Sequence, residues 1–383
     1  MNNWIVVGAG ITGATFARAR ADQGDKVVVL DSRNHVAGNC YDEFMKDYGL
    51  IHKYGPHLFH TNSDAVWQFL SRFTEWRPYE HRVRVVLDRN PHEDSPKFTF
   101  PVNFDTIEQV FGSPLADRMI GRLSSTGLQQ ISLKDLWELA SKDDPDLILQ
   151  RLYQMVFNSI FKPYTEKQWG TKIENVSPSV LRRVPIRLNR DSRYFTDKYQ
   201  ALPAGGYTKM IRNMLDHSDI TTQLETHCDH FEITKFLAKG FKVFYTGALD
   251  RLFNGRYGNL PYRSLRFVHA FGNAQPAATI NFPSAQGVTR VTDQSIVNNH
   301  TSRSSKVWHA LTYEHPGEYD PSSDSFNIPY YPVSNESSNL THRLYEKDAE
   351  DLGIVIGGRL GSFQYLNIDQ ACAQGLNLSK RVS

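Results

Sequence analysis

The chain begins with two short apolar runs on either side of a longer segment with helical spacing. Residues 4–7 (WIVV) and 26–30 (KVVVL) are the apolar runs. The segment between them ends at Gln23 and contains few helix breakers, and Gly24 suits the C-terminal end of a helix. The pattern therefore predicts a strand, a helix and a second strand, which together form one parallel α/β unit.

Further along the chain, a helical region is flanked by regions of strand-like alternation. Residues 82–101 predict two strands around a polar loop, and residues 104–162 have the apolar spacing of a helical insert. Runs within 262–313 predict an antiparallel sheet. Residues 241–250, and a strand, glycine turn and helix within 352–380, are expected to return to the first sheet.

The turn after the first strand carries the pattern G-x-G-x-x-G. Gly8, Gly10 and Gly13 allow the backbone to approach a pyrophosphate at the start of the helix. Asp31 ends the second strand, where an acidic side chain would contact a ribose hydroxyl. The unit therefore predicts a dinucleotide-binding domain. Arg33 and the following turn, Ala37 to Asn39, favour FAD over NAD.

Composition and charge narrow the class of protein. The 383 residues include 43 basic and 41 acidic side chains, which argues against general nucleic-acid binding. Three cysteines lie far apart, so no disulfide framework is expected, and a reducing compartment fits. The sequence has no apolar run long enough for a membrane span and no signal peptide before the first strand. We expect a cytoplasmic protein without membrane insertion.

The segment 52–62 (HKYGPHLFHTN) concentrates three histidines. His57 and His60 are three residues apart, but Gly55-Pro56 before them favours an extended or turning chain rather than a helix. No HExxH or CxxC pattern accompanies them, and we expect no metal site. From spacing alone, a polar turn and a ligand-binding wall both remain open.

Taken in order, these motifs and several others resemble the UDP-galactopyranose mutase family over nearly the whole chain. Single motifs are weak evidence, but the ordered set is highly specific. It comprises the FAD fingerprint followed by HKYGPHLFHTN, YTEKQWG, RVPIR, RYFTDKYQALPAGGYTK, YTGALD, YRSL, INF, TR, PYYPV and GGRLGSFQYLN.

The resemblance implies an α/β fold with a Rossmann-like FAD-binding domain, a helical insert domain and an antiparallel six-stranded sheet domain. The FAD-binding domain is expected to be discontinuous and to comprise 1–80, 200–250 and 330–383. The helical domain would comprise 102–163. The sheet domain, which would bind substrate, would comprise 81–101, 164–199 and 251–329.

The resemblance also implies the activity. The family interconverts the pyranose and furanose forms of a nucleotide sugar, here UDP-galactopyranose and UDP-galactofuranose, without net redox change. Reduced FAD attacks the anomeric carbon through N5 and displaces the nucleoside diphosphate. The implied protein is a cytoplasmic homodimer that supplies cell-surface polysaccharide biosynthesis.

Site residues are carried over from the family motifs. Arg187, Arg290, His60 and Arg359 are expected to be catalytic, and His60 is favoured over His57 as the wall of the sugar pocket. The cofactor is expected to contact Gly8, Gly10, Gly13, Asp31, Arg33, Gly38, Asn39, His57, His60, Arg359, Asn367 and Ile368. The substrate is expected to contact Tyr164, Trp169, Arg187, Tyr199, Arg263, Asn281, Arg290, Tyr331 and Tyr365.

Departures from the family pattern leave the substrate open. Asn367 replaces an acid, Ile368 a methionine and Asp369 a histidine, while Arg190 stands where an aromatic residue is usual. A mutase for a dTDP-6-deoxyhexose or a UDP-N-acetylhexosamine is therefore an alternative. An amine-oxidase-type flavin oxidoreductase is a further alternative, but such sites usually have an apolar substrate channel, which a cluster of arginines does not suit. A flavoprotein that binds a nucleotide sugar without chemistry is another alternative.

Overall fold

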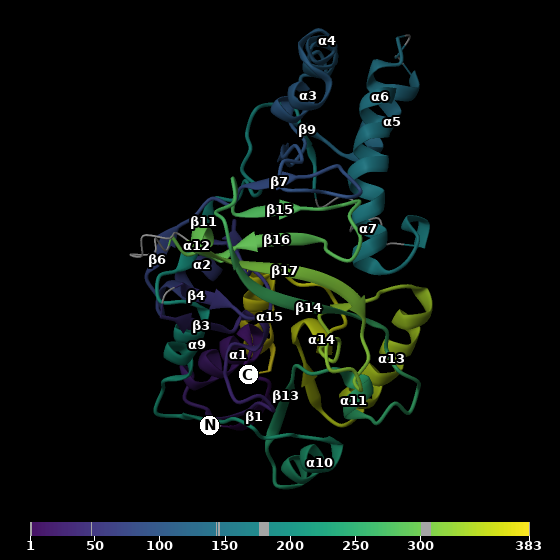
Figure 1. Ribbon diagram of the computed structural model, residues 1–383. Coiled ribbons are helices and arrows are strands. Elements are labelled where there is room, and N and C mark those ends of the chain that lie inside the picture. Colours follow the sequence, from purple (N-terminus) through teal and green to yellow (C-terminus); the bar gives the residue numbers. More distant parts are fainter. Residues whose placement is uncertain are drawn as a thin grey trace.

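The computed structural model describes residues 2–46, 48–142, 144, 146–175, 184–299 and 308–382. Figure 1 shows a lower part that contains both chain termini, a broad sheet above it, and a group of helices at the far end. The first residue of the RVPIR motif, at position 183, lies outside the described residues. Among the described residues, no helix is long and apolar enough to cross a bilayer.

The lower part is built on a parallel sheet. In the described chain its strands follow the spatial order β12 (Ile220–Gln223), β2 (Lys26–Leu30), β1 (Asn3–Val7), β13 (Lys242–Tyr245) and β19 (Ile354–Ile356). β1 pairs in parallel with β2 on one side and with β13 on the other. The predicted strand–helix–strand unit and the return of both later segments to the first sheet are therefore confirmed.

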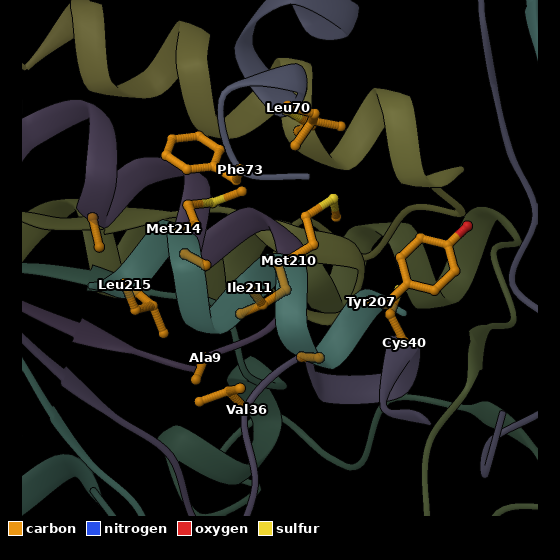
Figure 2. Close-up of a cluster of buried hydrophobic side chains, with 14 of the residues drawn as sticks. Ala9, Val36, Cys40, Leu70, Phe73, Tyr207, Met210, Ile211, Met214 and Leu215 are labelled. Atoms are coloured by element: carbon orange, nitrogen blue, oxygen red, sulfur yellow. The ribbon is translucent and has the colours of Figure 1, made fainter. Parts of the chain in front are cut away.

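Helix α1 (Ile11–Ala21) packs between this sheet and two other helices, α9 (Tyr207–Leu215) and α15 (Ile368–Arg381). The ring of Phe16 on α1 stacks on Phe244 of β13 with 4.0 Å between the centroids. Figure 2 shows the neighbouring layer, in which apolar side chains of α9 pack against Leu70 and Phe73. This core fixes the N-terminus of α1 relative to the rest of the cofactor region.

The start of α9 is held by an acidic side chain from a distant strand. The carboxylate of Asp42 accepts hydrogen bonds from the backbone N–H groups of Tyr207 and Thr208, at 2.6 and 3.0 Å. Gly206 precedes them with φ +86°, and a Cβ there would lie 2.6 Å from Asp42 Oδ2. Glycine is therefore required at this position because the carboxylate occupies the space of a side chain.

The broad sheet differs from the six-stranded antiparallel sheet that the resemblance implied. Among the described residues it has seven strands, in the order β18 (Tyr331–Pro332), β14 (Tyr262–Gly272), β17 (His309–Glu318), β16 (Arg290–Asp293), β15 (Thr279–Asn281), β7 (Val83–Val85) and β8 (Phe98–Phe100). β15 and β7 pair in parallel, because the predicted 82–101 hairpin joins the sheet through β7. The two-residue β18 comes from the segment that was expected in the FAD-binding domain.

The far end of the molecule is helical, as predicted for residues 104–162. It contains α3 (Phe104–Phe111), α4 (Ser113–Ser124), α5 (Leu133–Lys142), α6 (Ile148–Val156), the π-helical turn η2 (Phe157–Phe161) and α7 (Lys162–Trp169). A separate apolar core that includes Met119, Leu136 and Leu152 joins these helices to β7 and β8. The last helix, α7, runs on past the predicted limit and back towards the sheet (Figure 1).

Short elements complete the described chain. Small sheets are formed by β3 (Asp42–Met45) with β4 (Gly49–His52), by β5 (Phe59–Thr61), β11 (Tyr199–Pro203) and β6 (Trp76–Pro78), and by β9 (Gln130–Ile131) with β10 (Ile186–Arg187). The remaining helices are η1 (Gly38–Cys40), α2 (Asp64–Ser71), η3 (Ile173–Asn175), α10 (His230–Ala238), α11 (Leu249–Leu252), α12 (Gln294–Val297), α13 (Glu336–Asp351) and α14 (Gly358–Gly361). The three-domain division with the boundaries given above remains a proposal.

Candidate active site

A cavity of about 420 Å³ opens at the carboxyl ends of the parallel strands. We call it the dinucleotide cavity. It gathers every predicted cofactor-binding residue except His60, namely Gly8, Gly10, Gly13, Asp31, Arg33, Gly38, Asn39, His57, Arg359, Asn367 and Ile368. Because these residues come from both ends of the chain, the cavity depends on the return of α14 and α15 to the N-terminal sheet.

The glycine turn has the geometry of a phosphate cradle. A Cβ at Gly8, whose φ is +109°, would lie 2.0 Å from Oγ1 of Thr246, and a Cβ at Gly38 would lie 3.1 Å from the Cα of Gly10. Helix α1 begins at this point without a side-chain cap and without an acidic residue in its first turn. Its first N–H groups therefore face the cavity with the positive end of the helix dipole, which suits an anion.

Two side chains complete the cradle. Asp31 is buried, and its carboxylate oxygens accept backbone N–H groups of Ala9 and Arg33 at 2.8 and 2.9 Å. Arg33 donates from Nη2 to Asn39 Oδ1 at 3.0 Å, while its Nη1 is buried with no hydrogen-bond partner among the described residues. An unpartnered buried guanidinium nitrogen is costly unless a ligand accepts from it, so the residues present fit a pyrophosphate-containing cofactor.

The histidine segment forms one wall of the dinucleotide cavity, through His57. Burial, together with the neighbouring His52, lowers the pKa of His57 to about 3, so its imidazole is neutral at physiological pH. His52 is buried behind it and accepts the backbone N–H of His57 at 3.1 Å. No group of three or more histidine, cysteine or acidic side chains gathers as a metal site within the described chain. Of the three histidines, only His57 lines the dinucleotide cavity.

A second cavity, of about 190 Å³, lies between α7 and the broad sheet. We call it the tyrosine cavity. Six predicted substrate-binding residues line it: Tyr164, Trp169, Asn281, Arg290, Tyr331 and Tyr365. α7 supplies the first two, β15 and β16 supply Asn281 and Arg290, and the C-terminal segment supplies the last two tyrosines. Four separate segments thus converge on one cavity.

Arg290 is the cation of the tyrosine cavity. Its Nε donates to Glu314 Oε2 at 2.8 Å, and the two residues are direct cross-strand partners in β16 and β17. Burial opposes the charge of Arg290, but Glu314, Tyr164 and Tyr331 together outweigh this effect and hold the pKa of Arg290 above its ordinary value. No described residue accepts a hydrogen bond from either Nη atom of Arg290. The outer edge of the guanidinium can therefore bind an anion.

Arg359 connects the two cavities. It lines the dinucleotide cavity, and its guanidinium lies over the rings of Tyr331 and Tyr365, at 5.4 and 4.8 Å from the centroids. Its Nη atoms donate to the backbone carbonyls of Tyr330 and Leu366. A ligand held between the tyrosines would therefore reach the inner end of the cofactor.

Comparisons with known proteins agree with this geometry. The family model described as UDP-galactopyranose mutase matches residues 159–365, and a model of NAD(P)-binding Rossmann-like domains matches residues 6–73. A UDP-galactopyranose mutase of Mycoplasma genitalium is 34% identical over 96% of this chain and 91% of its own. This chain belongs to the UDP-galactopyranose mutase family. A dTDP-fucopyranose mutase of Escherichia coli is 30% identical over 99% of this chain and 98% of its own.

Solved structures show how widely the fold of this mutase family member is shared. A crystal structure of reduced UDP-galactopyranose mutase superimposes with a TM-score of 0.66 at 14% identity, covering 100% of this chain and 95% of the other. A putrescine oxidase variant gives a TM-score of 0.56 at 14% identity, covering 99% and 98%. These likenesses concern the fold alone. With the family and the fit of the dinucleotide cavity established, FAD is the cofactor.

Removal of Arg33 should weaken cofactor binding in this mutase family member. We expect Arg33→Ala to lower FAD affinity about tenfold or more, because a charge-assisted hydrogen bond to a buried anion is worth about 1.5–3 kcal/mol. The measurement is the flavin absorbance retained after gel filtration and the Kd of the apoprotein for FAD. Arg190→Ala, which removes a positive charge at the surface outside both cavities, is the control and should bind FAD like the wild type. Equal FAD affinity in Arg33→Ala and the wild type would contradict the assignment.

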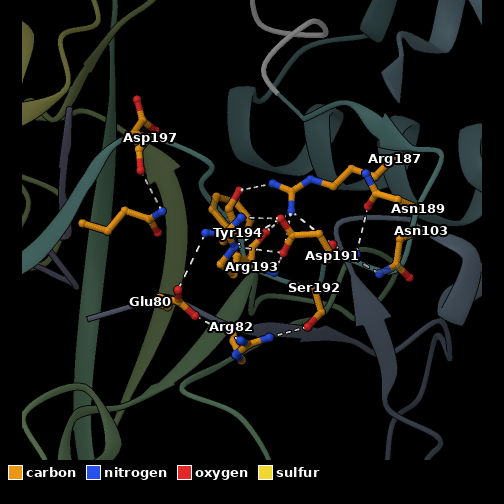
Figure 3. Close-up of polar contacts among 11 residues, drawn as sticks. Glu80, Arg82, Asn103, Arg187, Asn189, Asp191, Ser192, Arg193, Tyr194 and Asp197 are labelled. Carbon is orange, nitrogen blue, oxygen red and sulfur yellow. Dashed lines mark hydrogen bonds and ion pairs between the residues drawn. The ribbon is translucent and has the colours of Figure 1, made fainter. Parts of the chain in front are cut away.

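Arg187 does not line the tyrosine cavity, contrary to the prediction from the family motif. Figure 3 shows its guanidinium turned towards the backbone of residues 191–194. It donates to the carbonyls of Asp191 and Tyr194, each at 3.1 Å, and to that of Arg193. This arrangement satisfies the carbonyls of a tight loop and holds Tyr194 at the cavity wall, so in this conformation Arg187 supports the site from behind.

Arg263 also lies outside the linings of both cavities. Its Nε donates to the carbonyl of Gln168 at 3.0 Å and its Nη2 to that of Lys167 at 3.2 Å. These carbonyls lie at the C-terminal end of α7, where a cation is favourable. The YRSL arginine therefore caps the helix that carries Tyr164 and Trp169, and does not itself face the cavity.

Two further predicted residues are displaced from the cavities. His60, which was favoured over His57, faces Asp197 with 2.9 Å from Nδ1 to Oδ2 and stacks on Phe195. Tyr199 stacks on Trp67 at 4.4 Å and donates its hydroxyl to Asp64 at 2.8 Å. Both lie in the pairing of β5 with β11, in which His60 is opposite Gln200 and Tyr199 is opposite Thr61, and neither side chain lines a cavity. Arg190, the other departure from the family pattern, pairs with Asp105 and Glu108 at the surface.

Sequence reasoning missed several residues of the site. Gln168 and Tyr194 line the tyrosine cavity, and Glu314 anchors Arg290. Gln168 is buried, and its Oε1 has no hydrogen-bond partner among the described residues. A signal for Glu314 was present, because an acid within the strand-like run KVWHALTYE needs a buried partner. The register that supplies Arg290 as this partner is set only by sheet pairing.

Proposed function

We propose that the chain interconverts UDP-galactopyranose and UDP-galactofuranose at the junction of the two cavities. The observation that carries the proposal is the position of Arg359 between the dinucleotide cavity and the tyrosine cavity. The tyrosine cavity is lined by four tyrosines and by Arg290, which Glu314 holds in place. This arrangement supports a nucleotide sugar whose base lies deep in the tyrosine cavity and whose anomeric carbon faces the cofactor.

Each wall of the tyrosine cavity suits one part of such a ligand. Tyr164 and Trp169 of α7 offer ring faces to a pyrimidine, and the amide of Gln168 offers hydrogen bonds to its edge. The Nη atoms of Arg290 suit the diphosphate, and the neighbouring hydroxyl of Tyr331 can donate to it. Asn281, whose side-chain amide has no hydrogen-bond partner among the described residues, can contact a sugar hydroxyl.

When bound and reduced, FAD supplies the nucleophilic nitrogen that this reaction requires at the anomeric carbon. The chain itself holds the departing diphosphate close by for recapture, through Arg290. His57 remains neutral and therefore contributes a hydrogen bond without a competing positive charge near the sugar. The neighbouring Arg359 is fixed by two carbonyls and restricts the space in which the sugar can turn.

A mutase for a dTDP-linked 6-deoxyhexose is the second candidate. It is supported by the similarity to the dTDP-fucopyranose mutase of Escherichia coli. It is also supported by the joint substitution of Asn367, Ile368 and Asp369, of which the first two line the dinucleotide cavity. Asp369 accepts a hydrogen bond from Thr61 at 3.1 Å, which joins the start of α15 to β5. UDP-galactopyranose remains preferred because the YTEKQWG wall is intact.

A substrate panel tests this choice. We expect the dithionite-reduced protein to convert UDP-galactofuranose to UDP-galactopyranose faster than it converts dTDP-fucofuranose or a UDP-N-acetylhexosamine, as measured by chromatography. A kcat/KM more than about tenfold higher for the dTDP sugar, equivalent to about 1.4 kcal/mol, would reverse the preference. Stoichiometric consumption of oxygen during turnover would instead indicate an oxidase of the amine-oxidase type.

Three broader features belong to the same proposal. We infer a homodimer, a cytoplasmic location and a product used in cell-surface polysaccharide biosynthesis, as the family resemblance implies. All three cysteines are free and buried, which supports a reducing compartment. Light scattering of the purified protein tests the homodimer.

A further inference from the structure

Lys167 makes an unusual set of contacts for a surface helix. It lies on α7, and its Nζ donates hydrogen bonds to the backbone carbonyls of Phe282, Ala285 and Val288 at 2.5, 2.7 and 2.7 Å. All three carbonyls belong to the connection between β15 and β16. Lys167 forms no ion pair with a described residue. Its three donors are thus all used on backbone acceptors.

The two elements that Lys167 joins are opposite walls of the tyrosine cavity. On α7, Tyr164 and Gln168 line the cavity one turn apart, and Trp169 follows. On the other side, Asn281 ends β15 and Arg290 begins β16, so the connection held by Lys167 runs between two cavity residues. The ammonium group therefore sits at the point where a shift of either wall would change the width of the cavity.

The chemistry of this contact favours a fixed separation. The carbonyls at the C-terminal end of α7 carry the negative end of the helix dipole, and Lys167 places a cation in that last turn. Arg263 fixes the same end of α7 to β14. Three carbonyls without a donor would be left facing one another if the ammonium were removed, so the connection would rearrange.

We propose that Lys167 is a positioning residue of the tyrosine cavity, which holds α7 and the β15–β16 connection at the separation required by a ligand that spans both walls. The proposal rests on the proposed function, since it assigns the base to the α7 wall and the diphosphate to Arg290. It predicts that Lys167 matters most for ligands that carry both parts.

The test compares UDP with uridine. In Lys167→Met we expect the Kd for UDP, followed by tryptophan fluorescence, to rise about tenfold or more, since the charged hydrogen bonds that set the cavity width are lost. The Kd for uridine, which contacts the α7 wall alone, should change less than about twofold. KM should rise in parallel with the Kd for UDP, kcat should change little, and FAD content should be normal.

Two further variants keep the test decisive. Lys162→Met makes the same chemical change on the same helix, where the side chain of Lys162 has no hydrogen bond or ion pair with a described residue. This variant should bind both ligands like the wild type. Lys167→Gln replaces the ammonium by an uncharged amide with two N–H donors, and it takes the place of Lys167→Met if that variant does not fold. Unchanged UDP binding, or equal losses for UDP and uridine, would overturn the positioning role. Failure of the wild type to bind UDP would instead overturn the proposed function.

Discussion

Arg290→Ala is expected to lower kcat/KM for the sugar nucleotide by about 10²–10³-fold. A unit charge pair about 4 Å apart is worth on the order of 4 kcal/mol at an effective dielectric near 20. The loss of an interaction of this strength corresponds to the expected fall in kcat/KM. Within the described lining of the tyrosine cavity, Arg290 is the only cationic side chain. The measurement is steady-state kinetics of the reduced enzyme, and FAD content should stay normal because Arg290 does not line the dinucleotide cavity.

Matched variants separate the loss of the contact between Arg290 and the diphosphate from a loss of protein stability. Arg290→Ala leaves Glu314 buried, 1% exposed, without its partner, so some loss of thermal stability is also expected. Arg290→Lys should restore only part of the activity, since lysine lacks the planar fork that contacts two phosphate oxygens. Arg190→Ala removes a surface arginine and should leave turnover unchanged. Near-normal turnover of Arg290→Ala would remove this residue from the diphosphate site.

The oxidised protein should be inactive, and reduction should switch activity on without consumption of electrons. The described lining of the tyrosine cavity contains no carboxylate, thiol or amine that could attack the sugar. In the dinucleotide cavity, burial raises the pKa of Cys40 to about 12 and that of Cys228 to about 11, so both thiols are protonated at neutral pH. The absence of a reactive thiol from the described linings, together with the family, favours the cofactor as the source of the nucleophile.

Cofactor replacement tests this directly. Protein reconstituted with 5-deaza-FAD, in which a carbon replaces N5, should lose turnover by at least about 10³-fold while its Kd for UDP is unchanged. Reconstitution with FAD is the control and should restore activity after dithionite reduction. Substantial turnover with the deaza cofactor would leave FAD an electrostatic or structural role. Activity of the fully oxidised protein would point to the same conclusion.

The buried side chains show why some predictions held and others did not. Gly8, Gly10, Gly13 and Arg33 all line the dinucleotide cavity, since the strand–helix–strand unit that carries them is a local structure. Arg187, Arg263, Arg290 and Arg359 look alike in sequence, since each stands in a family motif. Arg187 and Arg263 donate to backbone carbonyls behind the cavities, whereas Arg290 and Arg359 line them. Arg359 also donates to backbone carbonyls and yet lines a cavity, so the two groups differ only in where the folded chain places each side chain.

The histidine segment 52–62 likewise contains one side chain that lines a cavity and one that does not. His57 and His60 share one motif, yet β5 pairs with β11 and turns His60 towards Asp197, while His57 remains on the cavity wall. Successive side chains of a strand point to opposite faces of the sheet, and the pairing register decides which face is which. The sequence of one strand does not specify the strand with which it pairs. The sequence by itself determined the parallel α/β unit, the FAD turn, the helical insert and the family. The tertiary structure alone decided which arginines and histidines line the two cavities, because that choice depends on long-range register and on which backbone acceptors lie nearby.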